Sequence, residues 1–585
     1  MKSTRSARAA VLLLGASMIA AACGSSSKTG AATTAATTAT TVAAAAPTTA
    51  AATPTTAAAP STTAAGVKPP AGGMILSFDI STKAVWDDGT PVTVKDFQCT
   101  HSAVMKTPGS NSTTGYDQID KIDQGKDDHQ VVITFKTIYA PYKTLFTAQL
   151  LESSKVKNCD DVSAEFQDNI PFSNRPYKIE SWSKDQLVLV PNAKYFGPEK
   201  PAATKVVMVP KADSDTELAS LKSGESDFIF PQAFSGIKEA LTDPNIKFTP
   251  GYGTNYEGLY FQQKSGPFSD ATFRKAFAKS VDRDAILKAI YDPIFPGAPL
   301  LNCGLWVPTI GKWCDDTIFK GYYDPTGAEK LLTDAGWKKG ADGMWADKTG
   351  KVPEIRWMIN AGNKRRENTQ ALMLPLFAKA GFNVKADNCD AACVFQKRLP
   401  ALDFDLGMYI NTASPDPTVT SIMSCSQVPT DANGNKGQNS SGWCNKDASD
   451  LMAKSDAELD QTKRIDQIHQ IGKAVAADAV MLSLFQFPNI AAWRTDKLDG
   501  AIDKDAGNFE GFQNIWEWKP KSGSQITIGA EQWPDCLNPI TECANSSWYV
   551  WTTAFKVIMG PWDTTSGGEY VDTPLLAAPA TVVTG

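Results

Sequence analysis

Histidine is the scarcest potential metal ligand in this chain, with three in 585 residues. His101, His129 and His469 lie far apart in sequence, which excludes a zinc hydrolase of the H-E-x-x-H type. The chain has no C-x-x-C pair, which argues against a zinc ribbon or a thioredoxin-like redox motif. It also lacks a G-x-S-x-G element and a phosphate-binding P-loop. We therefore expect no metal and no cofactor.

An excess of positive charge is also missing, because 57 basic residues face 63 acidic ones and the net charge is −6. This balance argues against a nucleic-acid-binding protein, which usually carries a basic patch. Phe, Trp and Tyr occur 26, 15 and 14 times, so global disorder is also excluded. The length predicts three or four domains, or two large lobes.

The N-terminus has the pattern of an export signal. Lys2, Arg5 and Arg8 precede 14 apolar or small residues at 9–22, a run too short to span a membrane. We therefore predict a signal peptide over 1–22. The residues before Cys23 resemble a bacterial lipobox, with Ala20 where Leu is usual, and this predicts lipidation of Cys23. The alternative is ordinary A-x-A cleavage after residue 22, which would leave Cys23 as a free thiol.

The segment after Cys23 is too poor in large side chains to fold. Residues 31–65 are Ala, Thr, Val, Pro and Ser only, which predicts a disordered tether over 23–70. No later stretch is long and apolar enough to span a membrane, so lipid would be the only membrane anchor.

Ten cysteines remain after Cys23, an even number that fits disulfides in an exported protein. Sequence proximity favours four candidate pairs and leaves Cys99 with Cys159 as the fifth, although it does not fix the connectivity. They are Cys99 with Cys159, Cys303 with Cys314, Cys389 with Cys393, Cys425 with Cys444, and Cys536 with Cys543.

Periodicity predicts a mixture of strands and helices from about residue 72 onward. Apolar runs predict strands over 74–80, 131–135 and 187–190. Helical spacing predicts helices from 215 to a stop at Gly224, over 272–291 and 325–335, and over 464–477. Such alternation indicates mixed α/β lobes.

Several motifs in a fixed order resemble the family 5 extracellular solute-binding proteins, the peptide and oligopeptide receptors of ABC importers. The matching segments are V-W-D-D-G-T-P-V-T at 85–93, R-P-Y-K-I at 175–179, N-A-K-Y-F at 192–196, L-K-S-G-E-S-D at 221–227, F-R-K-A to V-D-R at 273–283, Y-D-P to A-G-W at 323–337, and D-F-D-L at 403–406. Each motif alone is unspecific, but their common order is specific.

The resemblance implies an α/β fold with two lobes, of the periplasmic-binding-protein type (class II, cluster C), with an extra subdomain and a hinged ligand cleft. It further implies a monomer that passes its ligand to ABC permease and ATPase subunits. With the predicted export signal, it implies a lipid anchor on the outer face of the bacterial cell membrane.

The motif order suggests a circular permutation. The family's usual opening strand is absent near residue 72, and a segment that resembles it, Q-I-T-I-G-A-E, appears at 525–531. The usual family ending, F-Q-N-I-W at 512–516, comes just before it. If the chain is permuted, strand 526–530 enters the same lobe as 177–190, and residues 571–585 lie near 72–80. The alternative is a truncated family member with an unrelated tail.

The permutation sets the expected domain boundaries. We predict a small subdomain from 71–170 plus 566–585, a first lobe from 171–265 plus 485–565, and a second lobe from 266–484.

The ligand-binding loop departs from the peptide-binding pattern. The resemblance places an acidic anchor for the peptide ammonium four residues before Pro417, where this chain has Ala413. Asp416 is the candidate substitute, although an Asp beside Pro417 more often stabilises a turn. The triplet at 364–366, Lys-Arg-Arg, could meet a ligand carboxylate, but we interpret it as a solvent-exposed helix start.

Aromatic residues are the other candidates for ligand contacts. The resemblance places five of them in segments that line the cleft: Trp533, Trp548, Tyr549, Tyr256 and Tyr409. Aromatic walls suit both peptides and sugars. Core packing is an equally good interpretation for each of them.

The sequence thus predicts a solute-binding lipoprotein that captures a peptide or a similar small polar ligand for an ABC importer. The alternatives are a surface sensor or adhesin, or an oligosaccharide-binding protein, with the same fold. A serine hydrolase is a remote alternative: S-x-x-K at 154–157 and K-T-G at 348–350 resemble penicillin-binding enzymes, but S-D-N is missing.

Overall fold

The computed structural model describes residues 68–232, 236–240, 242–433, 437–502, 504, 512–565 and 567–585. The predicted signal peptide, Cys23 and all but the last three residues of the tether lie outside this part. Within it, no helix has the length and apolarity needed to cross a membrane.

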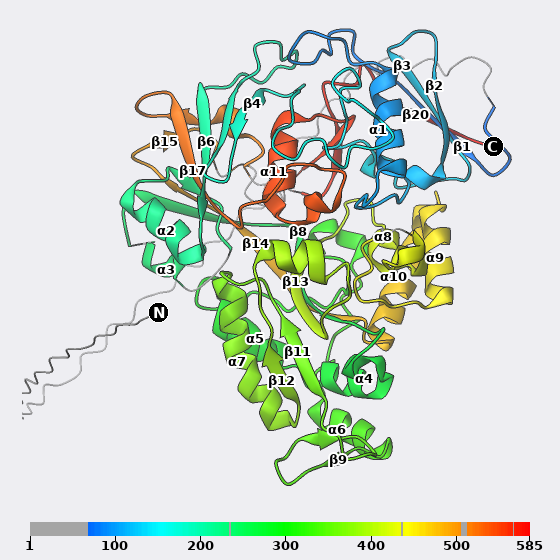
Figure 1. Cartoon of the computed structure of the whole chain (residues 1–585), viewed down its shortest axis with the longest axis vertical. Coiled ribbons are helices and arrows are strands. Elements are labelled where there is room, and N and C mark those ends of the chain that lie inside the picture. Colours follow the sequence, from blue (N-terminus) through cyan, green and yellow to red (C-terminus); the bar gives the residue numbers. More distant parts are fainter. Residues whose placement is uncertain are drawn as a thin grey trace, which may run out of the picture. The chain divides into compact units, whose positions relative to one another are not determined.

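A ten-stranded sheet runs through both lobes (Figure 1). Its strands, in spatial order, are β12 (Asn383–Ala386), β11 (Glu354–Met358), β13 (Leu406–Thr412), β8 (Ile246–Phe261), β14 (Met481–Arg494), β7 (Phe228–Ile229), β17 (Gln525–Glu531), β6 (Lys205–Lys211), β5 (Leu187–Pro191) and β4 (Tyr177–Trp182). We call the part with β4–β7 and β17 the first lobe and the part with β11–β13 the second lobe.

Strands β8 and β14, of 16 and 14 residues, connect the two lobes. One end of β8 pairs with β13 of the second lobe, while the far end of β14 pairs with β7 of the first. Their shared ladder is interrupted twice, between Ser483 and Phe485 and between Gln486 and Pro488. The second irregularity explains how Pro488 is tolerated in a central strand, because proline cannot complete a regular ladder.

Helices surround the second lobe. They are α4 (Ala271–Lys279), α5 (Arg283–Ile286), α6 (Pro325–Asp334), α7 (Lys364–Ala380), α8 (Thr420–Met423), α9 (Lys446–Asp456) and α10 (Gln461–Ala477). Helix α7 connects the parallel strands β11 and β12, as a parallel pair requires. A two-stranded hairpin of β9 (Lys338–Lys339) and β10 (Trp345–Ala346) follows α6.

The helix predicted over 272–291 is wrong as a single element. It breaks after α4, and α5 continues as a π-helical turn, η4 (Leu287–Tyr291). Asp282 starts the second part by accepting a hydrogen bond from the Ala285 amide. The new direction buries Arg283, whose guanidinium donates to the carbonyls of Leu301, Ser483 and Phe319. These tertiary hydrogen bonds favour the break over the single continuous helix that the apolar spacing of the sequence predicts.

The first lobe carries the helices α2 (Ser214–Ser223), α3 (Ile237–Ala240) and α11 (Trp548–Val557). It also carries two short antiparallel strand pairs. In one, β15 (Leu498–Asp499) pairs with β16 (Lys519–Pro520), and in the other, β18 (Trp562–Thr564) pairs with β19 (Tyr570–Asp572). Helix α2 ends at Gly224, as predicted, where a φ of 77° favours glycine.

A separate four-stranded sheet packs against the first lobe. Its order is β2 (Ile119–Gln124), β3 (Gln130–Phe135), β1 (Met74–Asp79) and β20 (Thr581–Thr584), and α1 (Val94–Lys106) packs on it. The W-D-D-G motif is structural, because the indole N–H of buried Trp86 donates to Asp96 Oδ2 at 3.2 Å. The same Asp96 oxygen accepts a hydrogen bond from the Thr93 amide and so caps the start of α1. One continuous hydrophobic core includes this sheet and the first lobe.

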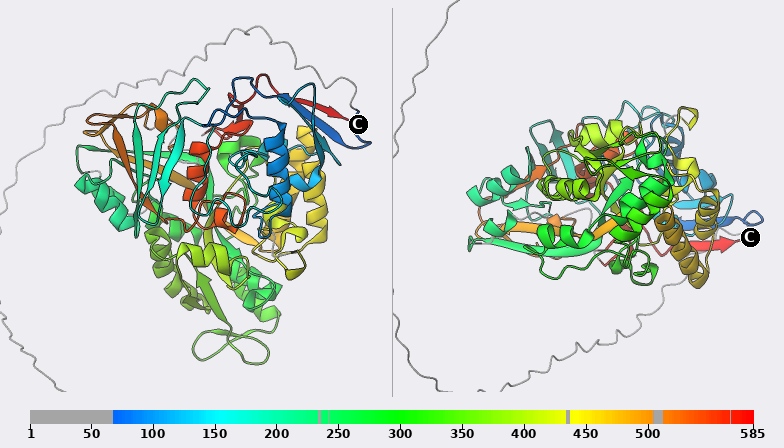
Figure 2. Two further views of the ribbon diagram at one scale, coloured as in Figure 1. Left: turned by 45° about the horizontal axis from the view of Figure 1, so that its top comes forward. Right: turned by 90° about the horizontal axis from the view of Figure 1, so that it is seen from below.

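The C-terminal segment occupies the two places that a permuted chain requires. Strand β17 pairs in parallel with β6, in the same sheet as β4 and β5. Strand β20 pairs antiparallel with β1, and the Gly585 amide donates to the Gly73 carbonyl at 3.1 Å. Both views in Figure 2 show the red β20 beside the blue strands. The permutation and the exact domain boundaries stay hypotheses that this arrangement supports.

Five disulfides link the ten described cysteines in the five candidate pairs, four of them close in sequence and the fifth the remaining pair Cys99–Cys159. Two of them, Cys425–Cys444 and Cys536–Cys543, brace loops near the main cavity described below. These loops carry little regular structure, so the crosslinks limit the freedom of the chain there.

Candidate functional site

A cavity of about 430 Å³ lies between the two lobes. Its walls come from both lobes and from the connecting strands β8 and β14. The first lobe contributes residues of 230–232, 532 and 542–551, and the second lobe contributes residues of 366, 395–400, 409–423 and 437–441. This volume falls within the usual range of small-molecule sites.

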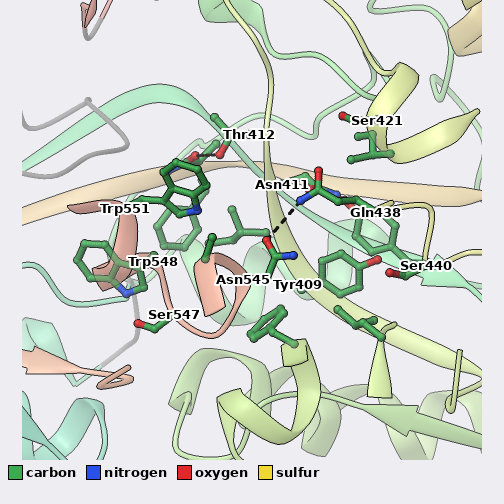
Figure 3. A pocket seen from close by; sticks show the side chains of 18 of the residues that line it. Tyr409, Asn411, Thr412, Ser421, Gln438, Ser440, Asn545, Ser547, Trp548 and Trp551 are labelled. Atoms are coloured by element: carbon green, nitrogen blue, oxygen red, sulfur yellow. Dashed lines mark hydrogen bonds between the residues drawn. The ribbon is translucent and has the colours of Figure 1, made fainter. Parts of the chain in front are cut away.

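Aromatic side chains form much of the apolar wall. Trp548 and Trp551 lie three residues apart at the start of α11, so both face the cavity (Figure 3). Trp548 also contacts Phe230, with a centroid distance of 5.5 Å. Across the cavity, Tyr409 stacks on Tyr260 at 4.0 Å. These rings offer flat apolar surfaces to a ligand from two sides.

Side-chain amides form the polar wall and hold one another in place. The Gln438 amide nitrogen donates to Asn111 Oδ1 at 2.8 Å and to Asn545 Oδ1 at 3.3 Å, the second bond being drawn in Figure 3. Asn411 donates to the Tyr260 hydroxyl at 2.8 Å. Each amide carries more donors and acceptors than these bonds use, so the wall can bind neutral polar groups.

The two lobes touch one another around the cavity. Gln438 of the second lobe reaches Asn545 of the first. Ala140, which follows β3 of the four-stranded sheet, donates its amide to the Asp456 carbonyl of the second lobe at 2.7 Å. The hydroxyls of Ser414 and Tyr570 lie 3.3 Å apart. The structure therefore shows the cleft in a closed arrangement.

A cluster of buried charges lies at the start of α7. Arg365 and Arg366 are 0% and 2% exposed, so the interpretation of 364–366 as a solvent-exposed helix start is wrong for these two residues. Both guanidiniums bind the buried carboxylate of Glu257 on β8, Arg366 at 3.0 Å. Arg365 also donates to Gln232 at 2.6 Å. Of the two arginines, Arg366 lines the cavity.

Two buried carboxyl groups of the first lobe lie near each other, and one of them, Glu531, also lies near these arginines. Glu531 ends β17 and accepts a hydrogen bond from the Ser214 hydroxyl at 2.7 Å. Burial raises the pKa of Glu531 to about 7, and burial beside Glu531 raises the pKa of Glu217. The neighbouring arginines oppose the shift at Glu531 by stabilising its charged form.

Glu542 is the one acidic residue among the described residues that line the cavity. It begins the short helix η10 (Glu542–Asn545), next to the Cys536–Cys543 disulfide. Its Oε2 is buried without a hydrogen-bond partner, and burial raises its pKa to about 7.

A second cavity of about 270 Å³ adjoins the loop at 412–415. Ala413 lines this cavity, as do Thr144, Thr254 and Trp562. Its acidic residue is Asp563, which forms a two-bond ion pair with buried Arg175 at 2.5 and 2.8 Å. This carboxylate is therefore already neutralised.

The sequence profile of the bacterial extracellular solute-binding proteins, family 5 Middle, matches residues 59–431. The chain belongs to this family. Oligopeptide-binding protein AppA of Bacillus subtilis (strain 168) is 25% identical over 74% of this chain and 79% of its own length. Oligopeptide-binding protein OppA of Mycobacterium tuberculosis is 23% identical over 72% and 70%.

Solved family structures share the fold. AppA from Bacillus subtilis in complex with a nonapeptide has a TM-score of 0.68 at 23% identity, covering 78% of this chain and 89% of that one. The periplasmic EDTA-binding protein EppA has a TM-score of 0.66 at 22% identity, covering 77% and 85%. The two-lobed α/β fold is thus confirmed, and the chain is an extracellular solute-binding protein by family.

The aromatic residues predicted for the ligand site fall into two groups. Tyr409 and Trp548 line the main cavity. Tyr256 and Tyr549 are 0% and 1% exposed and are not among the residues that line the cavity. Trp533 is not a lining residue either, and its indole N–H donates to the Ser183 carbonyl. Their roles in binding stay predictions.

Asp416, the predicted substitute anchor, is also not among the lining residues. Its carboxylate pairs with Arg464 at 2.5 Å. Sequence reasoning missed Trp551 and Glu542. The three-residue spacing from Trp548 could have revealed Trp551, but no local signal marks Glu542.

Proposed function

We propose that this protein captures a peptide or a similar small polar ligand between its lobes and delivers it to the permease of an ABC importer. The observation that carries the proposal is the cavity itself, which both lobes wall with aromatic rings and side-chain amides. The relatives AppA and OppA are oligopeptide-binding proteins, which supports the same ligand class. No covalent step is required of these residues.

Closure of the lobes would couple binding to delivery. The lobes connect through β8 and β14, whose ladder is irregular near Ser483–Pro488 and can act as a hinge. A ligand that touches Tyr409 of the second lobe and Trp548 of the first favours the closed state, because only that state offers both contacts. A permease that recognises this state would accept only the loaded protein.

We further propose that the mature protein is held at the outer face of the cell membrane through a lipid on Cys23. The basic N-terminus, the short apolar run at 9–22 and the Ala/Thr/Pro tether support this placement. Substituting Cys23 by Ser should release the protein from the membrane fraction, while the unchanged chain should stay bound to it.

An oligosaccharide is the second candidate ligand. The paired indoles of Trp548 and Trp551 and the amide wall favour it, since sugars stack on indoles and exchange hydrogen bonds with amides.

Native mass spectrometry of residues 24–585, purified gently from the protein's own host, tests the function. Bound masses that differ by amino-acid residues would identify a peptide receptor. A single bound mass that matches a sugar would identify a saccharide, and not a peptide, as the ligand. A chain with no bound mass, and with no thermal stabilisation by peptide or sugar pools, would contradict the proposed function.

A further inference from the structure

The loop at 411–417 offers no free acid to a ligand. Ala413 has no carboxylate, and the Asp416 carboxylate is bound to buried Arg464. If the ligand carries a cationic nitrogen, its partner must lie elsewhere in the main cavity. Among the described lining residues, only Glu542 supplies a carboxylate.

The backbone around Glu542 fixes the position of its side chain. Its amide donates to the Gly109 carbonyl at 3.0 Å, and the adjacent Cys543 is crosslinked to Cys536. Gly109 lies directly against the side chain, since a Cβ added at this glycine would come within 3.8 Å of Glu542 Cγ. Glu542 therefore lines the cavity from a braced loop of the first lobe.

The Glu542 carboxyl group has no compensating charge in the described part of the chain. Its Oε2 is buried and unpartnered, and no described Lys, Arg or His forms an ion pair with it. Burial is the sole cause of its raised pKa. The other charged residue lining the cavity, Arg366, is bound to Glu257. Keeping a buried carboxylate charged without a partner costs free energy, so a cation that bound to it from the cavity would reduce this cost.

We infer that Glu542 binds the ammonium group of the ligand, and that the solute is therefore a primary amine, such as a peptide with a free amino terminus. This assignment rests on the proposed function and narrows its ligand class. It places the charge recognition on the first lobe, beside Trp548, instead of on the loop at 411–417 of the second lobe.

The surroundings of Glu542 suit an ammonium group. Asn545 lies one helical turn along η10, and Gln438 reaches it from the second lobe. An ammonium has three N–H donors. The Glu542 carboxylate can accept some of these hydrogen bonds, and the amide oxygens of this wall can accept the others. Because Gln438 belongs to the other lobe, an ammonium held here would also favour closure.

The test compares three probe pools on the soluble chain: tripeptides with free amino termini, the same tripeptides after N-acetylation, and neutral disaccharides. The variants are E542Q, which removes the charge, and E542D, which retains it. E354Q serves as the matched control, because Glu354 is exposed and is not among the residues that line the cavity. Native mass spectrometry identifies the retained molecules, and calorimetric titration gives their affinities.

We expect the unchanged chain to retain free-amine tripeptides and to release the acetylated ones. E542Q should lose about 30-fold or more in affinity for the free amines, as expected when one partner of a buried charge pair is removed. E542D and E354Q should keep the preference for free amines. Equal retention of acetylated peptides, or unchanged affinity in E542Q, would overturn the assignment of Glu542.

The outcomes separate this inference from the proposed function. Retention of disaccharides alone, or a host-derived ligand without an amine, would overturn the ammonium assignment and leave the solute-binding function intact. A host-derived primary amine that E542Q fails to retain would support it even if all three pools fail. If no pool and no host molecule binds, the proposed function fails and the inference fails with it.

Discussion

The two charged sites that face the main cavity are built in opposite ways. At the start of α7, buried Arg365 and Arg366 share the carboxylate of Glu257, with further bonds to Gln232 and Asn360. On the first lobe, the Glu542 carboxyl group is partly buried with one oxygen unpartnered. The two arginines share one counter-ion, although Arg365 Nε has no hydrogen-bond partner, whereas Glu542 has no counter-ion among the described residues.

This difference indicates which charges serve folding and which serve binding. A buried charge that is paired with a counter-ion holds segments together, and here the pair joins α7 to β8. A cavity-facing charge with no partner weakens the empty protein, and a ligand of opposite charge can recover that loss. The predictions below test this contrast.

Removing the shared carboxylate should have the largest effect. Glu257→Gln leaves Arg365 and Arg366 buried without a counter-ion, which typically costs about 3–5 kcal/mol for a broken buried pair. We expect a clear fall in the thermal unfolding midpoint at pH 7, followed by circular dichroism. E354Q, on an exposed part of β11, should unfold like the unchanged chain. An unchanged midpoint in Glu257→Gln would show that the arginines do not depend on this carboxylate.

Glu542→Gln should change stability in the opposite direction, and only at higher pH. The pKa of Glu542 is about 7 in the folded protein, against an ordinary value of 4.5. Between these values the unfolded chain loses its proton while the folded chain keeps it, so stability falls as pH rises from about 4.5 to 7. Glutamine removes this loss.

We therefore expect E542Q to be more stable than the unchanged chain by on the order of 1–3 kcal/mol at pH 8, and equal to it at pH 4. Urea unfolding at both pH values measures the difference. If E542Q gains no stability at pH 8, a neighbouring group already stabilises the Glu542 carboxylate. If E542Q is more stable at pH 4 as well, the gain does not come from the charge of Glu542.

The sequence could not reveal this contrast, because the decisive partners are distant in the chain. Lys364, Arg365 and Arg366 look like an exposed helix start, and their counter-ion, Glu257, lies 108 residues away from Arg365. Glu542 looks like an ordinary surface acid. Its environment arises only when Gly109 packs beside it and both lobes enclose the cavity that it lines.

Features that depend on local sequence were predictable. The strands at 74–80 and 131–135 correspond to β1 and β3, and Gly224 ends α2 through its positive φ. The ordered motifs indicated the family and therefore the two lobes. Of the lining residues, the aromatic ones were partly predictable, because Tyr409 and Trp548 lie in segments that carry the resemblance. The amide wall was not, since Asn and Gln are common on any surface.

Asp416→Asn should have a smaller effect, confined to stability. Asp416 pairs with Arg464, which also donates to the Pro417 carbonyl at 2.7 Å, so the substitution leaves a 5% exposed arginine with one partner fewer. We expect a loss of about 1 kcal/mol in the free energy of unfolding and no change in tripeptide affinity. If tripeptide binding collapses instead, the ammonium anchor lies on the second lobe and the contrast with Glu542 fails.

Relocating the segment that carries Glu542 should have the smallest effect. Residues 523–585 can be placed first and joined through two glycines to 71–522, because Gly585 already pairs with Gly73 and residues 521–524 are exposed. Chain order changes, but β17, the Cys536–Cys543 loop and β20 keep every spatial neighbour.

Short new connections alter loop-closure entropy by about 1 kcal/mol or less, so the rearranged chain should unfold at nearly the same temperature and bind the same probes. E542Q in that chain should again gain stability at pH 8. If the rearranged chain folds but loses this gain, the environment of Glu542 depends on chain order and not on the fold. If it fails to fold, residues 523–585 are not the displaced opening of the family fold, and the permutation hypothesis falls.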